Sequence, residues 1–168
     1  MKVKTVLIVD DEESLRQSLE KVLKNASYLT EVANSGNEAL ELLGRRSIDL
    51  VLSDLKMPNG DGLELLKSIK KKFPDVEVIL LTGYGTIETA VEAMKEGAYD
   101  FITKPPKKAV ILSTVERASE RQNLAQENKY LRAQLGRSTL VEDMIGTSLA
   151  FKKVREMIER VAPLEVKP

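Results

Sequence analysis

The chain contains no cysteine and no histidine among its 168 residues. Disulfide bonds, thiol nucleophiles, zinc sites built from cysteine and histidine, and histidine-based catalysis are therefore excluded. No apolar run reaches membrane-spanning length, and the start, Met1-Lys-Val-Lys, leads into a β-like stretch rather than a secretory apolar segment. These absences predict a cytoplasmic protein without a membrane partner.

An excess of charge of either sign is missing too. The chain has 26 basic and 26 acidic side chains, so no bulk electrostatic field directs it to nucleic acid or anionic lipid. Hydrophobic residues make up 42% and charged residues 31%, which is the balance of a globular protein. The length predicts one ordinary domain with a single core, and leaves room for an appendage.

Short apolar and β-branched runs alternate with amphipathic stretches through about the first hundred residues. The runs predict strands at 5–9, 29–33, 49–53, 76–81 and 98–102. Between them, the apolar periodicity predicts helices at 13–24, through 39–43 with a stop at Gly44, at 63–72, and at 86–95 with a stop at Gly97. Five strands separated by single helices predict an α/β fold with a doubly wound parallel sheet in the flavodoxin-like order 2-1-3-4-5.

A long helical stretch follows this alternation. Residues 107–135 contain no glycine or proline and predict a last domain helix that extends into a C-terminal helical linker. A heptad seam fits four of its residues, with the polar residue at a register-fixing position: Leu124, Asn128, Leu131 and Leu135. The pattern indicates a homodimeric coiled coil, and the alternative is a solvated end of the last domain helix.

Polar side chains follow four of the expected strands. In open parallel sheets, ligands bind beyond the carboxyl ends of the strands, so these side chains are expected to converge. Each has an ordinary explanation by itself, as a helix cap, an Asx turn, a strand end or a surface lysine. Together they place three carboxylates, a hydroxyl and an ammonium at one edge: Asp10, Asp11, Asp54, Thr82 and Lys104.

This set of groups is suited to phosphoryl chemistry. Three crowded carboxylates repel one another unless a hard cation lies among them, and an oxygen-only set fits Mg²⁺. Lys104 and Thr82 can contact phosphoryl oxygens. Because the chain has no histidine and no serine–base pair, a carboxylate is the natural acceptor, and Asp54 is the central one.

Residues 3–120 resemble the receiver domain of bacterial two-component response regulators. The resemblance lies in an ordered set of motifs: Asp10-Asp11, the stretch from Asp54 through Met57-Pro58 to Gly62, Thr82, and Lys104-Pro105. A receiver domain at 1–120 is therefore expected. It would accept a phosphoryl group from a sensor histidine kinase and act as a switch rather than as an enzyme.

The resemblance implies a metal site. Asp11 and Asp54 would bind Mg²⁺ directly, with the backbone carbonyl of Lys56 as a third protein ligand. Asp10 would act through water, and Asp54 would be the phosphoacceptor.

The resemblance also implies a switch. Lys104 would contact the phosphoryl group, across a cis bond to Pro105, and Thr82 would swing towards it. The aromatic switch position falls on Phe101, which lacks the hydroxyl of a tyrosine and could respond only through packing.

The stretch from Thr82 to Pro105 further resembles receivers of NtrC-type activators of the sigma-54 transcription machinery. A break at 136–139 and a helix at 149–161 resemble the start of their AAA+ domain, expected at 140–163. No G-x-x-x-x-G-K-[ST] motif and no helix-turn-helix is present, so neither ATPase activity nor DNA binding is expected of this chain. Sigma-54 RNA polymerase and DNA would be reached only through domains that the sequence does not contain.

Three other classes fit less well. A phosphohydrolase of the haloacid dehalogenase type needs Asp-x-Asp at its nucleophile, which neither Asp10-Asp11-Glu12 nor Asp54-Leu55-Lys56 supplies. A flavin-binding module needs a hydroxyl- and glycine-rich loop after the first strand, where this chain has acidic residues that repel phosphate. A purely structural interaction domain is the third alternative.

Overall fold

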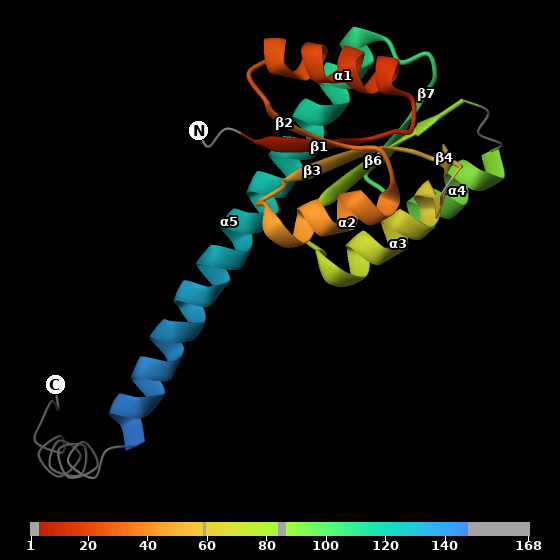
Figure 1. Ribbon diagram of the computed structural model, residues 1–168. Coiled ribbons are helices and arrows are strands. Elements are labelled where there is room, and N and C mark those ends of the chain that lie inside the picture. The colour runs from red at the N-terminus through yellow and green to blue at the C-terminus, as the bar shows by residue number, and fades with distance from the viewer. Residues whose placement is uncertain (1–3, 59, 84–86, 148–168) are drawn as a thin grey trace, which may run out of the picture. The chain divides into compact units, whose positions relative to one another are not determined.

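The computed structural model describes residues 4–58, 60–83 and 87–147 (Figure 1). The chain divides into two units, Met1–Ala125 and Gln126–Pro168, and the sheet with its covering helices belongs to the first. None of the helices in the described part of the chain is long and apolar enough to cross a membrane.

Five parallel strands form the central sheet in the order β2-β1-β3-β6-β7. The predicted fold class and strand order are therefore confirmed. The first two strands have the predicted bounds, and the others begin one or two residues later than predicted. Their bounds are β1 Thr5–Val9, β2 Leu29–Ala33, β3 Leu50–Asp54, β6 Glu77–Thr82 and β7 Asp100–Thr103.

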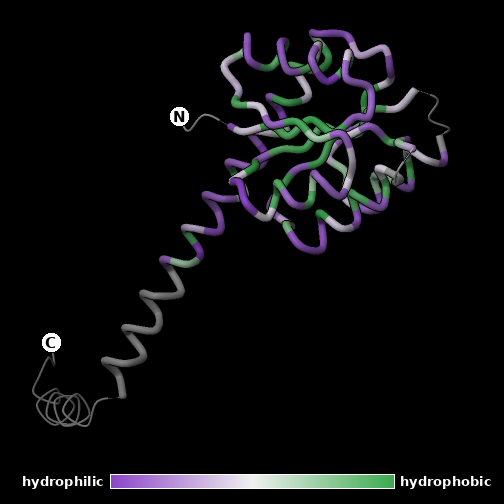
Figure 2. The backbone as a smooth tube through the Cα atoms, in the orientation of Figure 1, coloured by the Kyte–Doolittle hydropathy of each residue, from purple (hydrophilic) through white to green (hydrophobic). Residues whose placement is uncertain are grey.

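Helices cover both faces of the sheet, with α1 on one side and α2 and α3 on the other (Figure 1). Side chains alternate along β1: Val6 and Ile8 pack into a cluster with α1 and α5, whereas Leu7 and Val9 pack with α2 and α3. All four have no exposed surface, and the strands form the hydrophobic centre of the unit in Figure 2. The helix bounds are α1 Glu13–Asn25, α2 Gly36–Arg45, α3 Gly62–Lys72, α4 Ile87–Lys95 and α5 Lys108–Thr147.

Glycine ends one helix as predicted and fails to end two others. Gly97 follows α4 with a φ of 94°, a left-handed conformation that favours glycine. The predicted stop at Gly44 is wrong, because α2 continues to Arg45 and the chain becomes extended only at Arg46. The predicted break at Gly136 is wrong as well, because α5 continues to Thr147. A glycine inside a helix costs about 1 kcal/mol relative to alanine but removes no hydrogen bond.

The first part of helix α5 packs against the sheet. Ile111, Val115 and Ala118 are buried, and Gln122 is its last buried residue among those whose side chains are described. Leu124 and Leu131 are 67% and 50% exposed. The side chain of Leu135 and the helix predicted at 149–161 lie outside the described part of the chain.

Candidate functional site

Three carboxylates meet at the carboxyl ends of β1 and β3. Asp10 and Asp11 follow β1, Asp54 is the last residue of β3, and each contributes an oxygen to a group in which all ligand atoms lie within 4.8 Å of one another. Asp10 is completely buried and Asp54 is 7% exposed, whereas Asp11 is exposed. The cluster is therefore held inside the protein on one side and reaches solvent through Asp11.

Lys104 joins two of these carboxylates. Its Nζ donates to Oδ2 of Asp10 and to Oδ2 of Asp54, each at 2.8 Å. Burial by itself would lower the pKa of Lys104, but the hydrogen bonds and negative charges of Asp10 and Asp54 outweigh it and raise the pKa. The side chain therefore remains an ammonium ion at neutral pH and offsets part of the acidic charge.

Backbone N–H groups occupy the remaining oxygens of the two buried carboxylates. Oδ1 of Asp10 accepts from the N–H of Glu12 at 2.9 Å, and Oδ1 of Asp54 accepts from the N–H of Lys56 at 3.2 Å. Each of the two carboxylates thus contacts one backbone donor and the one ammonium. Among the described residues, none donates a hydrogen bond to the Asp11 carboxylate, so this group is available to a cation.

A short hairpin and the start of α3 pack against the end of β3. The hairpin consists of β4 (Lys56–Met57) and β5 (Gly60–Asp61), two strands that the sequence analysis did not predict. The N–H of Gly62 donates to the carbonyl oxygen of Leu55 at 2.9 Å. A Cβ at Gly62 would overlap the carbonyl oxygen of Asp54 and lie 2.8 Å from Cα of Leu55. Only glycine therefore lets α3 approach the strand end that carries Asp54.

Two other predicted residues, Thr82 and Lys104, lie at the same edge of the sheet, and Phe101 lies earlier on β7, opposite Leu80 of β6. Thr82 ends β6 and is 4% exposed, and its carbonyl oxygen accepts from the N–H of Lys104 at 2.7 Å. The Lys104–Pro105 peptide bond is cis, as the resemblance implied. Phe101 is 41% exposed and lines a small cavity together with Thr82 and with residues of α4.

The donor set fits a hard divalent cation. All three carboxylates offer oxygen, and the chain has no histidine or cysteine that would favour zinc. The acidic cluster could therefore bind a metal ion. The role of the Lys56 backbone carbonyl as a metal ligand stays a prediction.

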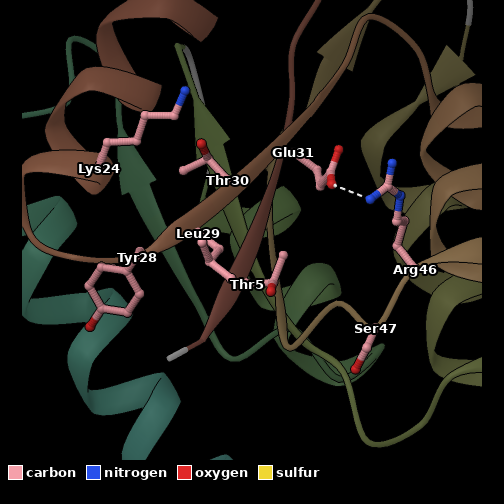
Figure 3. A pocket seen from close by; sticks show the side chains of 8 residues that line it. All are labelled: Thr5, Lys24, Tyr28, Leu29, Thr30, Glu31, Arg46 and Ser47. Atoms are coloured by element: carbon pink, nitrogen blue, oxygen red, sulfur yellow. Dashed lines mark ion pairs between the residues drawn. The ribbon is translucent and has the colours of Figure 1, made fainter. Parts of the chain in front are cut away.

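A second pocket lies at the opposite, amino-terminal end of the strands (Figure 3). It has a volume of about 500 Å³ and is lined by Thr5, Lys24, Tyr28, Leu29, Thr30, Glu31, Arg46 and Ser47. Its cations already have partners: Arg46 pairs with Glu31 at 3.5 Å, and Lys24 pairs with Glu20 at 2.8 Å. This pocket has no cluster of carboxylates, so the edge at Asp54 is the better candidate site.

Two sets of contacts were not predicted from the sequence, one near the site and one at the far end of the sheet. The guanidinium of Arg16 donates to the carbonyl oxygen of Asp10. Lys4, Asp49 and Gln122 form a buried polar network at the amino-terminal end of the sheet. Neither set contains a recognisable motif, because each depends on contacts that only the fold creates.

The chain is similar to a known protein family and to solved structures. Residues 6–116 match the response regulator receiver domain. The chain is 33% identical over 162 residues to the C4-dicarboxylate transport transcriptional regulatory protein DctD of Rhizobium meliloti (strain 1021), which covers 96% of this chain and 35% of that protein. It therefore spans about a third of the length of this curated relative.

Two solved structures are similar as well. NtrX from Brucella abortus has 38% sequence identity and a TM-score of 0.75, covering 97% of this chain and 35% of that one. The beryllofluoride-activated NtrC4 receiver domain dimer has 38% identity and a TM-score of 0.69, covering 71% of this chain and 99% of that one. The resemblance to NtrC-type regulators is thus confirmed. The chain belongs to the response regulators and carries their receiver domain.

Proposed function

We propose that this chain is a phosphorylation-dependent switch. Asp54 accepts a phosphoryl group from a sensor histidine kinase with the help of Mg²⁺, and the resulting change of conformation regulates sigma-54-dependent transcription. The observation that supports this most directly is the position of Lys104, whose Nζ lies 2.8 Å from a carboxylate oxygen of Asp10 and from one of Asp54. An acceptor carboxylate, a cation for a phosphoryl oxygen and two further carboxylates for a metal are thereby combined in one place.

The residues of the site have separate tasks in the transfer. An oxygen of Asp54 attacks the phosphorus atom, the bond from phosphorus to the donor breaks as the new bond forms, and an acyl phosphate results. Asp11, Asp54 and the Lys56 carbonyl would hold the cation directly, and Asp10 would act through water. Bound Mg²⁺ would neutralise charge on the transferred group. Lys104 would exchange a carboxylate oxygen for a phosphoryl oxygen, and no other substrate would be turned over.

Incubation with acetyl phosphate and Mg²⁺ is expected to add one phosphoryl group, and Asp54→Asn is expected to abolish the addition. The amide keeps the size and the hydrogen-bonding shape of the carboxylate but is a far weaker nucleophile. Intact-mass spectrometry measures the adduct. Asp75→Asn is the matched control, because Asp75 is an exposed aspartate that precedes β6 at the amino-terminal end of the sheet, remote from the cluster. A stable adduct on the Asp54→Asn protein, or labelling without any divalent cation, would contradict the assignment.

The switch is part of the same proposal. Thr82 and Phe101 line one small cavity with Thr89, Ala90 and Ala93, so a movement of the Thr82 side chain changes the space open to the Phe101 ring. An apolar groove lies beyond the ring, between Phe101 and α4, and would carry the change to the surface. The beryllofluoride-bound protein should show NMR shifts at Phe101 and along α4. Shifts confined to the acidic cluster would count against this route.

A homodimer through α5 is the proposed assembly. Leu124 and Leu131 are exposed in the single chain, and burying a leucine contributes about 1.5–3 kcal/mol, so the seam alone would give a weak dimer. Leu124→Asp combined with Leu131→Asp is expected to yield monomers in sedimentation equilibrium. Leu29→Asp, an exposed leucine on β2, is the control and should leave the association unchanged. If the double variant stays dimeric, the interface lies elsewhere and the seam is wrong.

The remaining expectations extend this proposal. The receiver would comprise residues 1–120, its last helix would continue at 107–135 as a linker, and 140–163 would begin an AAA+ domain. Contact with sigma-54 RNA polymerase and DNA would depend on domains beyond this sequence. A cytoplasmic location, where a sensor kinase presents its phosphoryl group, stays a prediction.

A further inference from the structure

Arg16 reaches from α1 back to the loop that carries the acidic pair. Its Nη1 donates to the backbone carbonyl oxygen of Asp10, six residues earlier in the chain. The side chain is half-buried, and its own backbone N–H bonds to the carbonyl oxygen of Glu12 at 3.1 Å, which fixes the first turn of α1. The guanidinium is therefore held beside the carboxylate cluster without contacting any carboxylate of it.

The hydrogen bond from Arg16 completes the attachment of Asp10. The N–H of Asp10 donates to the carbonyl oxygen of Ala33 at 3.3 Å, and its side chain accepts from the N–H of Glu12. The carbonyl oxygen of Asp10 then still needs a hydrogen-bond donor, and the guanidinium of Arg16 is that donor. The cap residue of α1, Glu12, makes no side-chain cap hydrogen bond, so the usual device that orders a helix start is missing here.

The peptide group between Asp10 and Asp11 is the one that Arg16 orients. Asp11 follows it directly, and no described residue donates to the Asp11 carboxylate, so its position depends on the backbone of this loop. A rotation of the peptide group would move Asp11 away from Asp10 and Asp54 and would open the 4.8 Å cluster. Partners behind the metal ligands commonly control metal affinity in this way.

We propose that Arg16 is a positioning residue for the metal site, which holds the Asp10–Asp11 peptide group so that the three carboxylates can bind a divalent cation together. The inference rests on the proposed function, because it concerns the cation that the phosphoryl transfer needs. Arg16 takes no part in the reaction itself and acts only through the loop.

The sign of the effect on Mg²⁺ affinity separates positioning from simple charge. A guanidinium near a cation site repels the cation, so if charge were its only influence, Arg16→Met would tighten Mg²⁺ binding. If Arg16 orients the loop, Arg16→Met weakens binding, and losses of a supporting partner weaken metal sites by roughly 10–100-fold. Arg16→Lys keeps the charge and one donor and is expected to fall between the wild type and Arg16→Met.

The experiment is a titration with Mg²⁺ alone, without phosphodonor, followed by NMR and by calorimetry. Arg16→Met is expected to raise the Kd at least about 10-fold, and labelling of Asp54 by acetyl phosphate should recover at saturating Mg²⁺. Arg45→Met, on a side chain paired with Glu41 on the surface of α2, is the control and should leave the Kd unchanged.

The outcomes distinguish a failure of the proposed function from a failure of the positioning role of Arg16. If the wild-type chain neither binds Mg²⁺ nor becomes labelled, the proposed function is wrong. If the wild type binds and is labelled, and Arg16→Met binds Mg²⁺ as tightly or more tightly, the positioning role of Arg16 is wrong. Should Arg16→Met fail to fold, Arg16→Lys decides alone: weaker binding supports the role, and a Kd equal to that of the wild type overturns it.

Discussion

Gly62→Ala is expected to lower the free energy of unfolding by about 3 kcal/mol, at the upper end of what one methyl group costs in a packed interior. The new Cβ would overlap the carbonyl oxygen of Asp54 and lie 2.8 Å from Cα of Leu55. Both obstacles are backbone atoms at and just after the end of β3, which cannot rotate away as a flexible side chain can. Either α3 separates from β3 or the end of β3 is displaced, and both changes disturb the acceptor.

Urea denaturation followed by circular dichroism measures the loss of stability, and the labelling rate with acetyl phosphate measures the displacement of Asp54. Gly44→Ala is the matched control, since a Cβ there meets no atom within 4 Å and the residue lies inside α2. It should stabilise the protein by about 0.5–1 kcal/mol. Equal effects of the two substitutions on the free energy of unfolding would show that the close backbone contact at Gly62 does not make alanine destabilising there.

The sheet was predictable because its strands are apolar runs with polar ends. Strands 5–9 and 29–33 have the predicted bounds. The strand predicted at 49–53 begins at Leu50 instead, although the N–H of Asp49 donates to the carbonyl oxygen of Thr5 at 3.0 Å and its carbonyl oxygen accepts from the N–H of Glu77 at 3.3 Å. Local pattern indicates where a strand lies, whereas its first residue depends on pairing with neighbouring strands that are distant in sequence.

The convergence of Asp10, Asp54 and Lys104 was also predictable, because the carboxyl ends of parallel strands meet at one edge of a sheet. The contact between Arg16 and the Asp10 carbonyl was not, since any arginine on a helix surface has the same local sequence pattern. Two of the helix ends predicted at glycines were wrong for a related reason. Gly44 and Gly136 lie within helices, and a glycine ends a helix only where the chain needs a left-handed conformation, as at Gly97.

The buried network at the far end of the sheet is the other feature that sequence could not indicate. Nζ of Lys4 donates to Oδ1 of Asp49 at 3.2 Å and to Oε1 of Gln122 at 2.6 Å, across 118 residues of sequence. The amide of Gln122 donates in turn to the carbonyl oxygens of Asp49 and Asp75. Lys4, Asp49 and Gln122 are each less than 7% exposed, so the network joins α5 to the central strands out of contact with water.

Lys4→Met is expected to cost about 3–5 kcal/mol, since removing one member of a buried ion pair leaves the other charge without a counterion. Asp49 would keep the N–H of Thr5 but lose its cation, and Gln122 would lose the donor to its carbonyl oxygen. Methionine fills most of the volume of the lysine stem, so the loss measures the polar contacts rather than a cavity. The midpoint of urea denaturation gives the value.

Lys24→Met is the control for a surface lysine. Lys24 is paired with Glu20 at 2.8 Å, one helical turn away, and its side chain is 58% exposed. Such pairs contribute about 0.3–0.5 kcal/mol. The hydrogen bond from Lys24 is the main reason that the pKa of Glu20 is lowered, so this small contribution is present at neutral pH and is lost as the pH falls through the acidic range.

A double-mutant cycle tests whether Lys4 and Gln122 act together. Because they share a hydrogen bond, Lys4→Met and Gln122→Leu should be non-additive by about 0.5–3 kcal/mol, whereas Lys24→Met and Gln122→Leu should be additive. Additivity in the first pair would mean that Gln122 is held by its bonds to the carbonyl oxygens of Asp49 and Asp75 alone. Gln122 is the last buried residue of α5 among those described, and every residue from 123 to 134 is exposed. A coupled pair would therefore mark the point at which α5 stops being part of the receiver core, and would tie the start of the proposed linker to the first residues of the chain.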